Sequence, residues 1–197
     1  MTDAERALSA APRGSFFAAV VDVLLRPGAF FAGREPRVRS KATVGIVVVL
    51  GLAIALTGAE KLDVITTADG LRRFLANLVV SLLLAGPLYW WLGGLWCLAR
   101  IRWSGEPEAH RDRAAMLFGV SEMVVAVPVI AWAVADLALS PVSPWASLPL
   151  ILAAAWSQFV SYQAVRATFP AVSPGRARVW FLIVPGLVYA VVFWRLL

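Results

Sequence analysis

Two carboxyl groups lie inside long apolar stretches of the sequence, where charged side chains are unusual. Glu122 and Asp136 are fourteen positions apart, and a helix turns by about 100° per residue, so both fall within about 40° of one helix face. A charge at the centre of a membrane helix costs about 2.5 to 3.5 kcal/mol, so an ionisable residue there is a candidate functional group. These two acids are therefore the first candidates for chemistry.

Uncharged polar residues on neighbouring apolar segments are the expected partners of these acids. Those of the fourth segment should meet Glu122, and those of the second should meet Asp136. The expected intramembrane polar cluster is Glu122, Gln158, Ser161, Tyr162, Asp136, Asn77 and Ser81. Such a cluster is either a polar cavity or proton path, or a set of interhelical hydrogen bonds worth about 0.6 kcal/mol each. No Lys or Arg is expected at mid-span to pair with Glu122.

Residues for other chemistry are scarce. The chain has one His and one Cys, His110 and Cys97, and the segment that contains His110 is expected to be a polar loop. Nucleophilic catalysis and metal binding need clusters of such residues. The sequence therefore predicts no enzyme, no metal site and no cofactor.

The composition indicates a membrane protein. Of 197 residues, 60% are hydrophobic and only 15% are charged, and the mean hydropathy is +0.78, whereas soluble domains carry about 25% charged residues. About 20 apolar residues cross the hydrocarbon core as a helix. The sequence predicts an all-α bundle of five spans, at about 42–59, 74–99, 114–139, 145–169 and 177–197. The two regions are then a cytoplasmic segment, 1–41, and a membrane domain, 42–197.

The positive charges predict the orientation, because cytoplasmic loops carry an excess of Lys and Arg. With the N-terminus inside, fourteen of the 18 basic residues fall on the inner side. Trp103 and Trp180 then lie at the inner interface, and Trp145 and Trp194 at the outer one. We expect a multi-pass protein of the cell (inner) membrane with a cytoplasmic N-terminus and an outside C-terminus. Because the basic residues sit in short membrane loops, nucleic acid is not an expected partner.

Prolines and small residues predict the local geometry of the spans. Pro87, Pro128 and Pro185 lie within predicted spans, and each should free a backbone carbonyl and allow a kink. Small residues four apart, such as Gly51 with Ala55 and Gly186 with Ala190, indicate close helix contacts.

The region before the first span contains an apolar stretch too short to cross a bilayer. A helix at about 15–26, ended by Pro27, should lie in the inner interface. The residues expected to contact lipid or a partner are Phe30, Phe31, Arg34, Arg37, Arg39 and Lys41. The alternative is that this segment packs against the bundle.

Several short motifs resemble the Yip domain family of five-span membrane proteins. Leu25-Arg26-Pro27-Gly28-Ala29-Phe30-Phe31 is similar to a segment before the first span of prokaryotic members, and residues 113–121, followed by Pro128, are similar to their third span. Trp156 and residues 172–177 resemble the fourth span and the loop after it. The eukaryotic members of that family contact Rab GTPases, and their signature motifs are absent from this sequence. The resemblance implies a membrane protein without established catalytic residues.

Two functions are consistent with these features. The first is a non-enzymatic membrane scaffold or accessory subunit, Yip-like, whose partners are the lipid bilayer and other membrane proteins or further copies of the chain. The alternative is a small permease or proton-linked carrier that uses the polar stripe around Glu122. A water-accessible Glu122 with partners from two other helices would favour the carrier.

Overall fold

The computed structural model describes residues 23, 25–32, 40–57, 67–138 and 148–196. Within these residues every element is helical and there is no strand. The elements are α3 (Pro27–Ala32), α4 (Ser40–Thr57), α6 (Ala68–Val80), η1 (Ser81–Ala85), α7 (Gly86–Trp103), α8 (Arg111–Ala138), α9 (Leu148–Thr168), α10 (Pro174–Arg178), η3 (Val179–Ile183) and α11 (Val184–Leu196). The all-α class predicted from the sequence is confirmed for the described residues.

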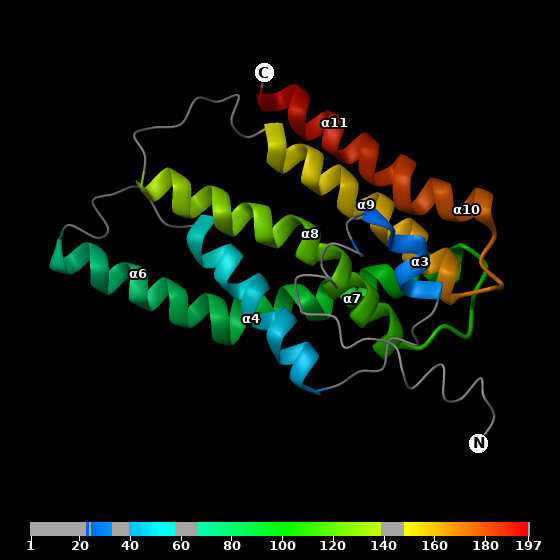
Figure 1. Cartoon of the computed structure of the whole chain (residues 1–197), viewed down its shortest axis with the longest axis horizontal. Coiled ribbons are helices and arrows are strands. Elements are labelled where there is room, and N and C mark those ends of the chain that lie inside the picture. The colour runs from blue at the N-terminus through cyan, green and yellow to red at the C-terminus, as the bar shows by residue number, and fades with distance from the viewer. Residues whose placement is uncertain (1–22, 24, 33–39, 58–66, 139–147, 197) are drawn as a thin grey trace.

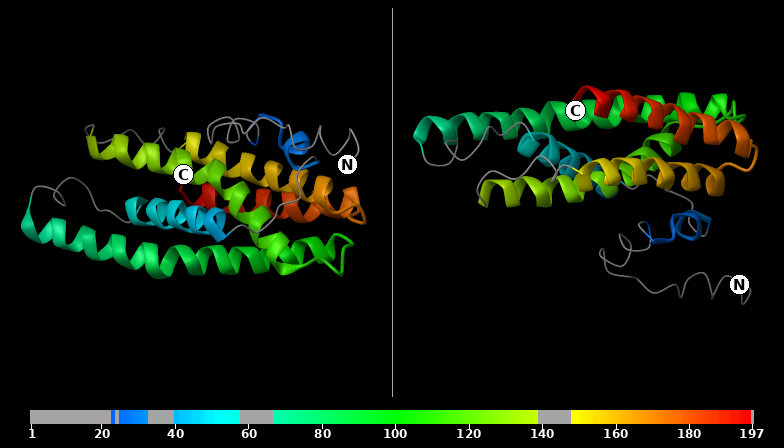
Figure 2. Two further views of the ribbon diagram at one scale, coloured as in Figure 1. Left: turned by 60° about the horizontal axis from the view of Figure 1, so that its bottom comes forward. Right: turned by 90° about the horizontal axis from the view of Figure 1, so that it is seen from above.

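The long helices lie side by side, and each runs opposite to the one before it in the chain (Figures 1 and 2). Helix α8 is central, because it packs against α4, α7 and α9. The segment α10–η3 packs against α9, and α3 also packs against α9. The short connection between α7 and α8 and the one between α9 and α10 lie at the same end of the bundle (Figure 1).

Two helices are long and apolar enough to cross a membrane. They are the continuous helix Ala68–Trp103, made of α6, η1 and α7, and residues Arg111–Ala135 of α8, while Thr43–Leu56 is a shorter apolar helix. Large apolar side chains also cover the outside of the bundle, for example Leu83 at 75% exposure and Leu187 at 63%. A helix that is apolar all round belongs either in a protein core or in lipid. Since these faces are not covered by protein, they are suited to lipid.

Glycines set the closest helix crossing. A Cβ atom on Gly86 would lie 2.8 Å from the Val47 carbonyl oxygen and 2.9 Å from the Gly51 Cα, so α4 and the start of α7 meet backbone to backbone. Gly94 packs in the same way against Ala115 of α8. The expected close contact at Gly51 is therefore present. At Gly186 it is not, because an added Cβ would meet nothing within 4 Å.

A π-helical turn precedes two of the three prolines expected to kink a span, Pro87 and Pro185. The Gly86 N–H bonds to the Ser81 carbonyl, five residues back, at the end of η1, and the Val184 N–H bonds to the Val179 carbonyl at the end of η3. Proline has no N–H, so Pro87 and Pro185 leave unbonded a carbonyl four residues back, which falls inside each π turn. Helix α8 instead continues through Pro128 without such a turn.

The N-terminal part of the described chain packs onto protein. Val23 and Leu25 are helical, Arg26 is not, and Pro27 begins α3. Proline is favoured in this first helical position, where its missing N–H costs nothing. Phe31 is only 4% exposed and lies in the core, with its ring edge-on to Phe30 at 5.1 Å.

Phe31 therefore contacts the bundle and not lipid, contrary to the interfacial placement, and α3 has the arrangement of the packed alternative. Most of the expected helix at 15–26 and the expected contact residues Arg34, Arg37 and Arg39 lie outside the described residues. Lys41 lies in α4, and its side chain is not described.

Candidate functional site

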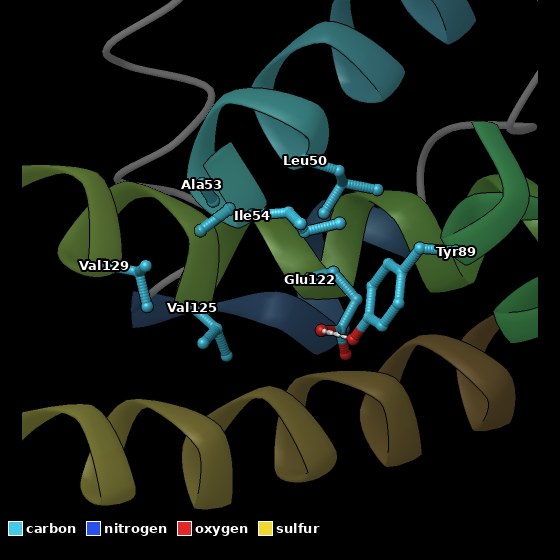
Figure 3. A pocket seen from close by; sticks show the side chains of 8 residues that line it. Leu50, Ala53, Ile54, Tyr89, Glu122, Val125 and Val129 are labelled. Atoms are coloured by element: carbon cyan, nitrogen blue, oxygen red, sulfur yellow. Dashed lines mark hydrogen bonds between the residues drawn. The ribbon is translucent and has the colours of Figure 1, made fainter. Parts of the chain in front are cut away.

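Glu122 of α8 faces the interior of the bundle and is held by a tyrosine of α7. The Tyr89 hydroxyl donates a hydrogen bond of 3.0 Å to Oε2 of the Glu122 carboxylate, and the two side chains point toward each other (Figure 3). Glu122 lies eleven residues after the first residue of α8, which places it about 16 Å along the helix. That is about half the thickness of a hydrocarbon core.

A pocket of about 190 Å³ opens beside this pair, between α4 and α8. Its polar residues are Tyr89 and Glu122, and its other walls are the aliphatic side chains of Leu50, Ala53, Ile54, Val125, Ala126 and Val129 (Figure 3). The pocket is thus an apolar chamber with one carboxyl group and one hydroxyl group in its wall.

Arg100 is buried in the same part of the bundle, although α7 ends only three residues later. Its side chain is 3% exposed, and a helical side chain points toward the helix N-terminus, which here is deeper into the bundle. The guanidinium lies 4.3 Å from the centre of the Phe181 ring of η3 and 5.8 Å from that of Trp96. These aromatic faces favour a cation. The sequence predicts no Lys or Arg at mid-span to pair with Glu122, and Arg100 lies near the end of α7, but its side chain is buried.

Gln158 connects Arg100 to α11. Nη1 of Arg100 donates a hydrogen bond of 3.0 Å to Oε1 of Gln158. The Gln158 amide nitrogen lies 3.3 Å from Ser157 Oγ and 3.5 Å from the Tyr189 hydroxyl. Gln158 is midway along α9, so this network also lies deep in the bundle.

We call Tyr89, Arg100, Glu122, Gln158 and Tyr189 the central polar cluster. Glu122 lies close enough to both Arg100 and Tyr189 to interact with them electrostatically, so the two hydrogen-bonded groups form one polar centre. Among the described residues, Tyr89 is the sole hydrogen-bond partner of Glu122, and no ion pair joins it to Arg100. The cluster brings together one carboxyl group, one guanidinium group, one amide and two hydroxyl groups, which come from α7, α8, α9 and α11.

Known proteins offer no match to this chain, whether it is compared with family models, with curated sequences or with solved structures. The resemblance to the Yip domain family rests on its short motifs alone.

The residues predicted to surround Glu122 take different partners. Gln158 does lie in the cluster, but it bonds to Arg100 and Tyr189 and not to Glu122. Ser161 is buried at 3% exposure, and within the described part of the chain it makes no hydrogen bond to Glu122. The Tyr162 hydroxyl lies farther along α9 and accepts a hydrogen bond of 3.4 Å from Nε of Arg178.

Of the two residues predicted to meet Asp136, Asn77 binds α4 and Ser81 binds Asn77. Nδ2 of Asn77 donates a hydrogen bond of 3.0 Å to the Ala55 carbonyl, and the Ser81 hydroxyl lies 3.5 Å from Oδ1 of Asn77. They hold the α4–α6 contact. Asp136 lies in α8, and its side chain is outside the described part.

Sequence reasoning missed Arg100, Tyr89 and Tyr189. Arg100 was assigned to a loop because the second span was expected to end at residue 99, whereas α7 continues to Trp103. A signal was present, since Gly94, Cys97 and Ser104 place small residues on the buried side of this helix at spacings of three and seven. Both tyrosines follow a π turn and the proline after it, and periodicity does not reveal such a turn. No group of three or more metal-binding side chains occurs in the described part of the chain.

Proposed function

We propose that the chain is a five-span membrane protein with its N-terminus in the cytoplasm and its C-terminus outside, in the cell (inner) membrane. Successive long helices run in opposite directions (Figure 1). This supports the proposal, because each helix then crosses to the other side of the membrane and each connection turns the chain back. Helix α4 (Ser40–Thr57), α9 (Leu148–Thr168) and the joined α10, η3 and α11 (Pro174–Leu196) would be the three crossings besides the two long apolar helices.

Aromatic residues support the assignment of the inner end. The Trp103 ring lies 4.6 Å from the Trp180 ring and 5.8 Å from the Trp96 ring, and Trp103 is 48% exposed. Tryptophans concentrate at the membrane interfaces. The same end carries Arg102, Arg111 and Arg176, as expected on the cytoplasmic side.

Within this architecture, we infer that the protein is a small proton-linked carrier that works through Glu122. The observation that carries the proposal is the placement of a half-buried Glu122 and a buried Arg100 in one cluster beside a pocket. Each charge costs about 2.5 to 3.5 kcal/mol inside a membrane, whereas an interhelical hydrogen bond returns about 0.6 kcal/mol. Because packing alone would be served better by apolar residues, a role in moving charge accounts for the cluster.

The π turns support the same inference. Transporters bind their substrates where membrane helices are interrupted by Gly or Pro, and π turns in helices are frequent at functional sites. Here η1 with Pro87 precedes Tyr89, and η3 with Pro185 precedes Tyr189, on two helices that run in opposite directions. Each interrupted helix thus supplies one tyrosine to the central polar cluster.

The test is proton movement in liposomes that contain the purified protein and an internal pH-sensitive dye. A pH gradient is imposed, and solutes of four classes are added outside: organic cations, organic anions, amino acids and sugars. A carrier dissipates the gradient with at least one class, and Glu122→Gln abolishes this movement while Glu108→Gln, in the loop between α7 and α8, retains it.

The second function is the Yip-like, non-enzymatic scaffold or accessory subunit. The apolar outer faces of α7 and α11, which suit lipid or another membrane protein, favour it. If no solute class moves protons, and Glu122→Gln instead changes which membrane proteins co-purify with the chain, the scaffold replaces the carrier.

A further inference from the structure

The pocket beside Glu122 has a defined chemical character. All of its lining except Tyr89 and Glu122 is aliphatic, and its volume is about 190 Å³. A closed cavity of about 150 Å³ holds one benzene molecule. This pocket is open on one side, so it has room for an apolar body of about six to eight carbon atoms that can extend out of the opening.

The carboxylate gives the pocket its charge preference. Glu122 receives one hydrogen bond, from Tyr89, while an ionised carboxylate can accept about four. Among the described residues no other donor occupies the remaining acceptor positions, and Figure 3 shows the carboxylate among the side chains that line the pocket. A positively charged hydrogen-bond donor would fill the acceptor positions of the Glu122 carboxylate and neutralise its negative charge.

Arg100 does not line this pocket. Its guanidinium is held by Gln158 of α9 and by the Phe181 ring of η3, whereas the pocket walls come from α4, α7 and α8. Among the described residues, the walls of the pocket therefore contain no positive group.

We propose that this pocket binds a small organic ammonium ion with an apolar body, in exchange for the proton of Glu122. The inference rests on the proposed carrier function and names its substrate class. In the exchange, the Glu122 carboxylic acid releases its proton to water and the carboxylate then binds R–NH₃⁺. The proton and the ammonium ion each bring one positive charge to the carboxylate, so the net charge of the site is the same in both states. Neither state leaves an unpaired carboxylate in the apolar interior, where an isolated charge is costly.

The binding test compares three probes with the same six-carbon chain: hexylammonium, hexanol and hexanoate. Saturable binding to the full chain in lipid nanodiscs is measured by calorimetry, against empty nanodiscs. Hexylammonium should bind about ten-fold more tightly than hexanol, because a hydrogen bond to a charged group is stronger than a neutral one, and hexanoate should not bind.

Two variants locate the site. Glu122→Gln should remove the preference for hexylammonium over hexanol, and Val125→Phe, which fills the pocket but keeps the carboxyl group, should weaken both probes. Glu108→Gln is the matched control and should bind as the wild type does. Equal binding of hexanol and hexylammonium by the wild type, or ammonium binding that persists in both pocket variants, would overturn the proposal.

The liposome experiment separates this inference from the carrier itself. Proton movement driven by hexylammonium supports both. Movement driven by anions, amino acids or sugars but not by hexylammonium keeps the carrier and refutes the ammonium site as its substrate site. Saturable hexylammonium binding without any proton movement refutes the carrier and the exchange, and leaves only a binding pocket.

Discussion

Arg100 and Gln158 join helices α7 and α9 by a side-chain hydrogen bond of 3.0 Å in the interior of the bundle. Another nitrogen of the guanidinium, Nε, is buried without a hydrogen-bond partner among the described residues. A buried cation with so few acceptors depends strongly on each of them. The link between the two helices is therefore a point where the stability of the bundle can be tested.

Gln158→Leu should destabilise the protein by about 1 to 3 kcal/mol, because it leaves the buried guanidinium without its acceptor. The double variant Arg100→Met with Gln158→Leu should lose less than the sum of the two single variants, since no charge then remains unpaired. Thermal unfolding in mild detergent, followed by circular dichroism, measures the differences. Additive losses would mean that the two side chains do not act as a pair.

The helices themselves could be predicted from the sequence because hydropathy reports which segments avoid water. The expected third span, 114–139, corresponds to α8 at Arg111–Ala138, and the expected fourth, 145–169, to α9 at Leu148–Thr168. Whether each helix crosses a membrane is a separate matter, since length and composition qualify only Ala68–Trp103 and Arg111–Ala135 as spans.

The candidate site could be predicted only in part. Glu122 and Gln158 were identifiable because polar residues are conspicuous in apolar segments. Their partners depend on how far α7 extends and how each helix is rotated, and one extra turn of α7 carries Arg100 from the expected loop into the core. The π turns at η1 and η3 change the direction in which Tyr89 and Tyr189 point, because the helix face after each turn is rotated. A hydrophobic pattern with a period of 3.6 residues does not predict this rotation.

Gly86→Ala should destabilise the bundle by about 1 to 3 kcal/mol, the usual cost of overpacking. The added methyl would lie within 3 Å of the backbone of Val47 and Gly51, and backbone atoms cannot move aside as a flexible side chain can. Gly186→Ala is the matched control, because its Cβ meets nothing within 4 Å, and it should be neutral or slightly stabilising. Equal unfolding midpoints for both variants would contradict the close crossing of α4 and α7.

Gly105→Ala should also destabilise, by about 1 to 3 kcal/mol, for a conformational reason. Gly105 has φ +116°, a value that L side chains rarely adopt, and it follows Ser104, whose carbonyl accepts the Ser173 N–H at 2.9 Å. A distorted turn would weaken this link between the two loops. Gly175→Ala, at an open position in α10, should leave the unfolding midpoint almost unchanged. A loss of stability as large as that of Gly105→Ala would show that the positive φ of Gly105 is not the cause.

The five-span topology predicts which positions a membrane-impermeant maleimide can reach. Cys97 is the chain's one cysteine and is buried, so Cys97→Ala provides a background for single cysteines at Asp69, Glu108 and Arg176. Asp69→Cys should be labelled from outside intact cells, because it begins the helix that enters from the outer side. Glu108→Cys and Arg176→Cys should be labelled only after the membrane is opened, because their loops lie at the end that carries most of the arginines. Labelling of all three cysteines from the same side would refute the crossing of the membrane by the joined helix α6–η1–α7. Reporter tags on the two termini that appear in one compartment would refute an odd number of spans.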